Sequence, residues 1–241
     1  MTLTHERYLE AIDKESAALA GAARNNLDAQ VPSCPGWSMS HLLGHLGRVQ
    51  RFWGEMAERA LTDPSAAGNH QPPQGVNLIE WFAESTQLLL ASIRDADLER
   101  PMWSWSPVKR VEFVPRRMAQ ETAMHRWDGT NAAGRPSSID ADLAVDGIDE
   151  LLFVYLATEA PLSDPPGSSV HIHTTDSDGE WLAVLDEEPV VTREHAKGDV
   201  ALRGPSSDVL LYLWGRMEPS SLVIHGDTAK LDQFRSVFDL E

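Results

Sequence analysis

The run MAQETAMHRWD at residues 118–128 places a glutamate and a histidine four positions apart. The run lacks Gly and Pro and is rich in helix-forming residues, so it predicts an α-helix. Residues four apart on a helix are separated by about 40° around its axis, so Glu121 and His125 share a face, and Asp128 follows one turn later. A carboxylate and an imidazole at this spacing can bind one divalent metal ion, although the same spacing also occurs as a simple solvated pair.

Two ligands do not complete a metal site, so a third must come from elsewhere in the chain. The best donor is His45, on a helix that is predicted to follow the turn PGWS at residues 35–38. His41 lies four residues before His45 and therefore on the same face. The two histidines are an alternative metal pair, and the other interpretation of His41 is a polar residue of the first helical turn.

These motifs resemble the mycothiol-dependent maleylpyruvate isomerase family, a branch of the DinB-like helical-bundle metalloproteins. The resemblance rests on VPSCPGWS at 31–38 leading into HLLGHLGR at 41–48, on ExxxHxxD at 121–128, and on VALRGPSSD with LLYLWGR between residues 200 and 216. It implies that His45, Glu121 and His125 bind zinc. It also implies two domains: a DinB-like four-helix bundle and a C-terminal sterol-carrier-like domain.

In the reaction that the resemblance implies, mycothiol binds zinc through its sulfur and adds to the cis double bond of maleylpyruvate. The adduct rotates about the new single bond and eliminates the thiol, which leaves fumarylpyruvate. Two imidazoles and one carboxylate would leave one zinc position open, and a thiol that entered it would lose its proton. We therefore expect an isomerase of this type, or an S-transferase that joins a low-molecular-weight thiol to an electrophilic small molecule.

Three further residues are candidates for the catalytic machinery. Asp128 is interpreted as a carboxylate that orients a ligand imidazole, or else as an acid at the helix end. Arg48, three residues after His45, could bind a substrate carboxylate, or could be a surface ion-pair partner. Arg216, at the end of LWGR, is the candidate for binding an anionic group or the sugar portion of the thiol.

Two other features carry weaker functional interpretations. Cys34 has no evident base nearby in the sequence, so a nucleophilic role is not favoured. His171 and His173 alternate on an expected strand and face the same side, and we interpret them as solvent-facing rather than as a second metal site.

The fold class predicted from the residue patterns is α+β. Residues 1–138 are expected to form the four-helix bundle, with helices near 3–28, 39–61 and 76–96 and a fourth that carries Glu121 and stops near Gly134. Residues 139–241 are expected to form a smaller α+β domain with an antiparallel sheet, because alternating runs are separated by short turns. The expected strands are 170–174, 181–185, 189–192, 200–202 and 222–225, with helices near 141–160, 205–216 and 227–239.

Composition limits the partners that the chain can have. The 241 residues include 20 Lys and Arg against 37 Asp and Glu, a formal net charge of -17, which argues against a nucleic-acid partner. The sequence shows no apolar run of about 20 residues and no secretory signal pattern, and its one cysteine excludes an intramolecular disulfide framework. We expect a cytoplasmic protein without membrane contact whose partners are a small electrophile and a thiol.

Two rival functions remain open at this stage. The chain could be a metal-dependent hydrolase, in which water fills the open metal position and Asp128 or His41 is the base. It could also be a non-catalytic protein that binds a small molecule or a partner. The intact set of His45, Glu121 and His125 argues against the non-catalytic interpretation.

Overall fold

The computed structural model describes residues 2–162, 165 and 167–238 of the chain. The chain separates into two compact units, one of residues Leu3–Ile139 and one that begins at Asp140 and includes the following C-terminal residues. Within the described part, no helix combines the length and the apolar character needed to cross a membrane. The α+β class is confirmed.

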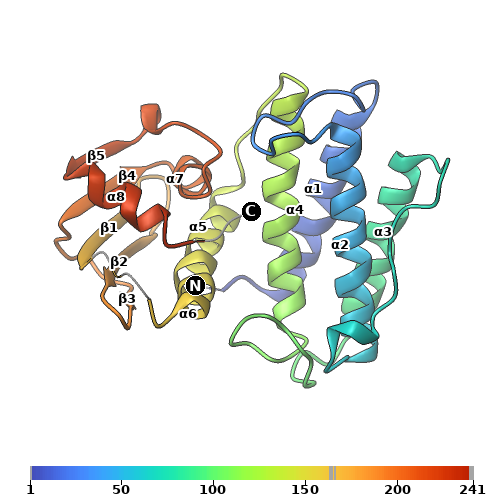
Figure 1. Cartoon of the computed structure of the whole chain (residues 1–241), viewed down its shortest axis with the longest axis horizontal. Helices are drawn as coiled ribbons and strands as arrows, with labels where there is room; N and C mark the ends of the chain where they lie inside the picture. Colours follow the sequence, from blue (N-terminus) through green and yellow to red (C-terminus); the bar gives the residue numbers. More distant parts are fainter. Residues whose placement is uncertain (1, 163–164, 166, 239–241) are drawn as a thin grey trace. The chain divides into compact units, whose positions relative to one another are not determined.

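The first unit is the predicted four-helix bundle, whose long helices stand side by side in Figure 1. α2 packs against α3 and α4, and α1 packs against the same two helices. The helices are α1 (His5–Ala23), α2 (Met39–Arg59), α3 (Leu78–Ile93) and α4 (Phe113–Ala132).

Local signals in the sequence explain where α2 and α4 begin and end. The Ser38 hydroxyl accepts a hydrogen bond from the His41 backbone N–H, and His41 Nδ1 accepts one from the Ser38 backbone N–H at 3.1 Å. This reciprocal cap satisfies two N–H groups that the first turn would otherwise leave unpaired. α4 ends just before Gly134, which has φ of 71°, a left-handed conformation that glycine adopts without strain.

A buried glutamine joins all four helices at the centre of the bundle. The Gln50 side chain of α2 donates to Ser16 of α1 at 3.1 Å and to Thr122 of α4 at 3.4 Å, and it accepts from Thr86 of α3 at 3.0 Å. Because these groups are buried, each depends on the others for its hydrogen bonds, so the network favours one arrangement of the helices. The buried apolar side chains of the bundle include Ile12, Leu19, Leu42, Leu46, Phe82 and Leu89.

The second unit contains a five-stranded sheet with helices. The strands lie in the order β3-β2-β1-β4-β5, so β1 is central. The strands are β1 (Ser168–Thr174), β2 (Glu180–Leu185), β3 (Val190–Thr192), β4 (Val200–Gly204) and β5 (Val223–Gly226). The helices are α5 (Ala141–Glu150), continued by a π-helical turn (Leu151–Tyr155) into α6 (Leu156–Glu159), then α7 (Ser206–Leu213) and α8 (Thr228–Arg235).

The sheet is mixed rather than purely antiparallel. β1 pairs with β4 in parallel, while β1–β2, β2–β3 and β4–β5 are antiparallel. The expectation of antiparallel pairing was therefore wrong for β1–β4. A parallel pair needs a long connection between its strands, and here the chain forms β2 and β3 before it returns beside β1 as β4.

The two faces of the sheet differ in chemistry. Val170, Ile172 and Trp181 point to a buried face, where the Trp181 Nε1–H donates to Asp149 of α5 at 3.1 Å. The alternate residues of the same strands, among them His171 and His173, point to the opposite face.

Candidate metal centre

The three predicted ligands of the bundle converge on one point. His45 comes from α2, whereas Glu121 and His125 come from successive turns of α4. Glu121 Oε1 lies 3.2 Å from His45 Nε2 and 3.3 Å from His125 Nε2. One ligand atom from each of the three residues lies within 4.8 Å of the others.

The Asp128 side chain is buried against the His125 ring and does not lie on the surface at the end of the helix. Its Oδ2 accepts a hydrogen bond from His125 Nδ1 at 2.9 Å, and its side chain has no solvent exposure. This contact fixes the ring so that its Nε2 atom faces Glu121. Asp128 is therefore buried against His125, and its role as an orienting carboxylate stays a prediction.

Electrostatic coupling holds charge on both members of the α4 pair. Burial alone would lower the pKa of His125, but the neighbouring carboxylates of Glu121 and Asp128 outweigh it and raise the pKa to about 9. Burial would likewise raise the pKa of Glu121, yet His125, His45 and Arg117 together hold it well below the usual value. Glu121 is therefore a carboxylate at neutral pH, the form that binds a cation.

Several residues near the cluster were not anticipated from the sequence. Ser33 donates to Asp128 Oδ1 at 2.5 Å, and Cys34 Sγ lies 3.8 Å from Asp128 Oδ2. The Trp37 ring lies 4.9 Å from that of His45, and Arg117 Nη2 lies 3.3 Å from Glu121 Oε2. Cys34 thus has an acid and an imidazole nearby after all, because they reach it from a helix that is more than 90 residues away.

His41 does not join this group. Its Nδ1 is engaged at the start of α2 with the Ser38 N–H and hydroxyl, both at 3.1 Å. None of the possible metal-binding clusters among the described residues includes His41. The structure therefore favours the interpretation of a polar first-turn residue.

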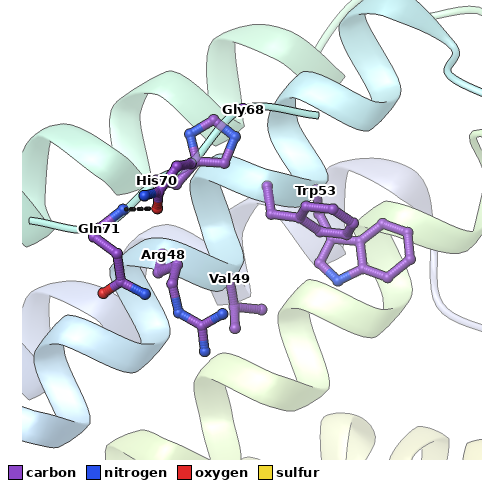
Figure 2. Close-up of a pocket in the computed structure, with 8 residues that line it drawn as sticks. Arg48, Val49, Trp53, Gly68, His70 and Gln71 are labelled. Atoms are coloured by element: carbon purple, nitrogen blue, oxygen red, sulfur yellow. Dashed lines mark hydrogen bonds between the residues drawn. The ribbon is translucent and has the colours of Figure 1, made fainter. Parts of the chain in front are cut away.

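Arg48 lies on the exposed side of α2 and lines a pocket of about 260 Å³ (Figure 2). Val49 and Trp53 of the same helix line it too, together with His70 and Gln71 from the segment after α2. His70 Nε2 is paired with Glu55 at 2.9 Å. An exposed guanidinium beside such a pocket can bind a carboxylate from solution.

Arg216 belongs to the second unit and lies just beyond α7. Its Nη1 donates to the Trp214 backbone carbonyl at 2.8 Å, and its guanidinium lies 5.8 Å from the centre of the Trp214 ring. The side chain is half-buried. These contacts place the guanidinium beside Trp214, and the role of Arg216 in binding a thiol stays a prediction.

A four-helix bundle that brings two histidines and a glutamate together between α2 and α4 has an arrangement that helical proteins use to build metal sites between facing helices. Residues 9–128 match the model of the mycothiol maleylpyruvate isomerase N-terminal domain, and residues 142–233 match that of the family's C-terminal domain. The chain belongs to this family. The predicted resemblance is confirmed, and with it the prediction of an enzyme.

Two solved structures share the fold. Both are crystal structures of a mycothiol-dependent maleylpyruvate isomerase, one of them a histidine-to-alanine mutant. Each is 13% identical to this chain, covers 93% of it and is itself covered to 95%, with TM-scores of 0.65 for the mutant and 0.64 for the other. No curated protein sequence matches the chain.

Proposed function

We propose that the chain is a zinc-dependent and mycothiol-dependent isomerase that converts a cis double bond of a maleylpyruvate-like substrate to trans. The observation that carries the proposal is the convergence of His45, Glu121 and His125, in a family named for this reaction. Nitrogen and carboxylate oxygen donors from three residues suit zinc. Zinc held here would keep a position for the sulfur of the thiol and would stabilise its thiolate form.

The protein's own residues prepare the ligands. Asp128 holds the Nδ1–H of His125, so Nε2 is the ring nitrogen that can bind the ion, which must displace the Nε2 proton. Arg117 lies beside Glu121 Oε2, which leaves Oε1 directed at the two imidazoles. The ring of Trp37 lies against His45 and contributes apolar surface beside this ligand.

Binding of the organic partners falls to two arginines in this proposal. Arg48 binds a carboxylate of the substrate, because it is exposed and lines a pocket on α2. Arg216 binds the thiol, consistent with its half-buried and oriented guanidinium. Replacement of Arg48 by Lys is expected to raise KM for the substrate more than it lowers kcat, since a lysine keeps the charge but loses the two-pronged contact.

The alternative of S-transfer to another electrophile uses the same site, and only the acceptor distinguishes it. The hydrolase interpretation is less well supported. Its two candidate bases are both occupied, since Asp128 is bound to His125 and Ser33 while His41 caps α2.

The test is the formation of fumarylpyruvate from maleylpyruvate by purified protein, with and without mycothiol and with and without zinc. We expect turnover only when both are present, and weak replacement of mycothiol by glutathione. A panel of other electrophiles, assayed for thiol adducts, separates isomerase from transferase. Metal-dependent turnover that is equally fast with no thiol would contradict the proposal in favour of a hydrolase.

A further inference from the structure

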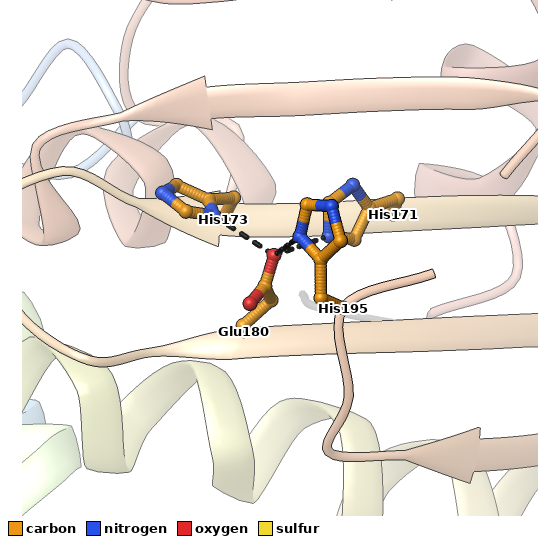
Figure 3. A group of neighbouring side chains, drawn as sticks. All are labelled: His171, His173, Glu180 and His195. Atoms are coloured by element: carbon orange, nitrogen blue, oxygen red, sulfur yellow. Dashed lines mark hydrogen bonds and ion pairs between the residues drawn. The ribbon is translucent and has the colours of Figure 1, made fainter. Parts of the chain in front are cut away.

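A second cluster of metal-binding side chains lies in the C-terminal unit, on the face of the sheet away from the apolar core. Figure 3 shows His171 and His173 on β1, Glu180 on the neighbouring strand β2, and His195 on the segment between β3 and β4. The three imidazoles all contact the Glu180 carboxylate. The predicted solvent-facing role of His171 and His173 fits this poorly, since His171 is 9% exposed and both are engaged with Glu180.

The register of the β1–β2 pair positions three of the four residues of this cluster. His173 is directly opposite Glu180 in the β1–β2 pair, and His171 lies two residues along the same face of β1. Cross-strand and diagonal neighbours on one face are close enough for these side chains to meet. The spacing is therefore imposed by the sheet rather than by flexible side chains.

The fourth member, His195, is brought in by a segment that is anchored on both sides. Two residues before it, Arg193 makes a two-pronged ion pair with Asp149 at 2.7 and 2.8 Å. Four residues after it, Asp199 accepts hydrogen bonds from the Ser169 backbone N–H at 2.9 Å and hydroxyl at 3.0 Å. The segment thus holds His195 over the sheet even though the side chain of His195 is 82% exposed.

The contacts converge on a single atom. Glu180 Oε1 lies 2.9 Å from His171 Nε2, 2.9 Å from His173 Nδ1 and 2.5 Å from His195 Nδ1. One carboxylate oxygen has two lone pairs, so three N–H donors on it exceed its capacity as a hydrogen-bond acceptor. The hydrogen bond from His173 is the largest cause of a pKa for Glu180 that is lowered to about 2, so the group is a carboxylate at neutral pH.

From this geometry we propose that His171, His173, Glu180 and His195 form a second metal site that binds a divalent transition-metal ion. One ligand atom from each residue already lies within 4.8 Å of the others. Around a tetrahedral zinc ion with bonds of about 2.0–2.1 Å, ligand atoms are about 3.4 Å apart, so small side-chain rotations would admit the ion. Three imidazoles select zinc, nickel, cobalt or copper over calcium and magnesium, which prefer oxygen ligands.

Open space adjoins this site. A cavity of about 330 Å³ is lined by His171 and His195 on one side and by residues of β4 and β5, including Ala201 and His225, on the other. An ion at the site would therefore be reachable from solution. The ion would also fasten the β3–β4 segment to the sheet through His195.

The test counts metal ions on the full chain without a polyhistidine tag. Protein stripped by a chelator is incubated with zinc at a few molar equivalents, separated from free metal and analysed by mass spectrometry. We expect a protein that carries His195→Ala to bind one zinc per chain fewer than the same protein without it, with affinity at that site lowered at least about 100-fold. The variant suits this purpose because His195 is exposed, so its removal should not disturb folding.

The experiment is done in two parents, the natural chain and His125→Ala, so that it does not depend on zinc binding in the bundle. Glu180→Gln should behave as His195→Ala does, because it removes the charged ligand. His225→Ala is the matched control: this histidine lines the same cavity but is not in the cluster, so its removal should leave the count unchanged. Equal zinc content with and without His195→Ala in both parents would show that the cluster is held by hydrogen bonds alone and would overturn the proposal.

Discussion

Replacement of Asp128 by Asn tests the link between the buried acid and the proposed zinc ligand. The substitution preserves shape while it removes a charge that is fully buried and bonded to His125 Nδ1 at 2.9 Å. An amide NH2 at this position can donate to Nδ1, which favours the tautomer with its proton on Nε2, the nitrogen that faces Glu121. The proton would then occupy the lone pair that the metal needs.

The expected size of the effect follows from the role of such partners elsewhere. Loss of a carboxylate that orients a ligand imidazole weakens metal binding about 10- to 100-fold, which is about 1.4 to 2.8 kcal/mol. Zinc affinity is measured by competition with a chromophoric chelator. Ser33→Ala is the matched control, since it removes the hydrogen bond to Asp128 Oδ1 but keeps the carboxylate on His125 and should have a smaller effect.

Chemical denaturation of both variants establishes that they are folded under the conditions of the titration. A folded Asp128→Asn variant that binds zinc as tightly as the natural protein would refute the reasoning. Asp128 would then be a residue of the bundle core that contributes to stability without acting on the metal.

Three further outcomes are expected. Because the folded pKa of His125 is raised to about 9, its charge stabilises the metal-free protein most below about pH 6.5, and this contribution of at most about 3 kcal/mol is lost as the pH rises through 9. The urea midpoint of the metal-free protein should therefore be higher at pH 6 than at pH 9.5. The difference between these two midpoints should be much smaller in His125→Ala. Cys34→Ser should retain most of the thiol-dependent activity while chelation abolishes it, and loss of activity in a zinc-loaded Cys34→Ser protein would instead assign Cys34 a direct role. Gly47→Ala should destabilise the bundle by about 1–3 kcal/mol in thermal unfolding, because the new Cβ would lie 2.3 Å from the Trp81 ring. Gly44→Ala on the same helix should be neutral or stabilising, because its Cβ would lie 3.9 Å from the nearest atom, in Pro72.

Local patterns in the sequence were sufficient for the elements of the bundle. The spacing of Glu121 and His125 determines that they share a face of α4, and the turn at residues 35–38 locates the start of α2. That His45 faces this pair is a matter of packing between helices. The family resemblance supplied it, whereas spacing alone could not.

Contacts between distant segments were not readable in the same way. Ser33 and Cys34 reach Asp128 across about 95 positions, and no local pattern records that approach. Alternation predicted that His171 and His173 share a face, but their common partner depends on the β1–β2 register, and His195 depends on the course of a loop. The short turns between strands suggested hairpins throughout, which concealed the parallel β1–β4 pair.

The proposed ligand set of His45, Glu121 and His125 also bears on the order in which parts of the bundle unfold locally. His45 and Glu121 are 76 positions apart in the chain, on helices that are not consecutive. A bound ion would therefore close a long loop and would stabilise only states in which α2 and α4 remain side by side. Amide hydrogen exchange in these two helices should slow on zinc addition more than exchange in α1, which supplies no ligand, so the ion would set which part of the bundle opens last.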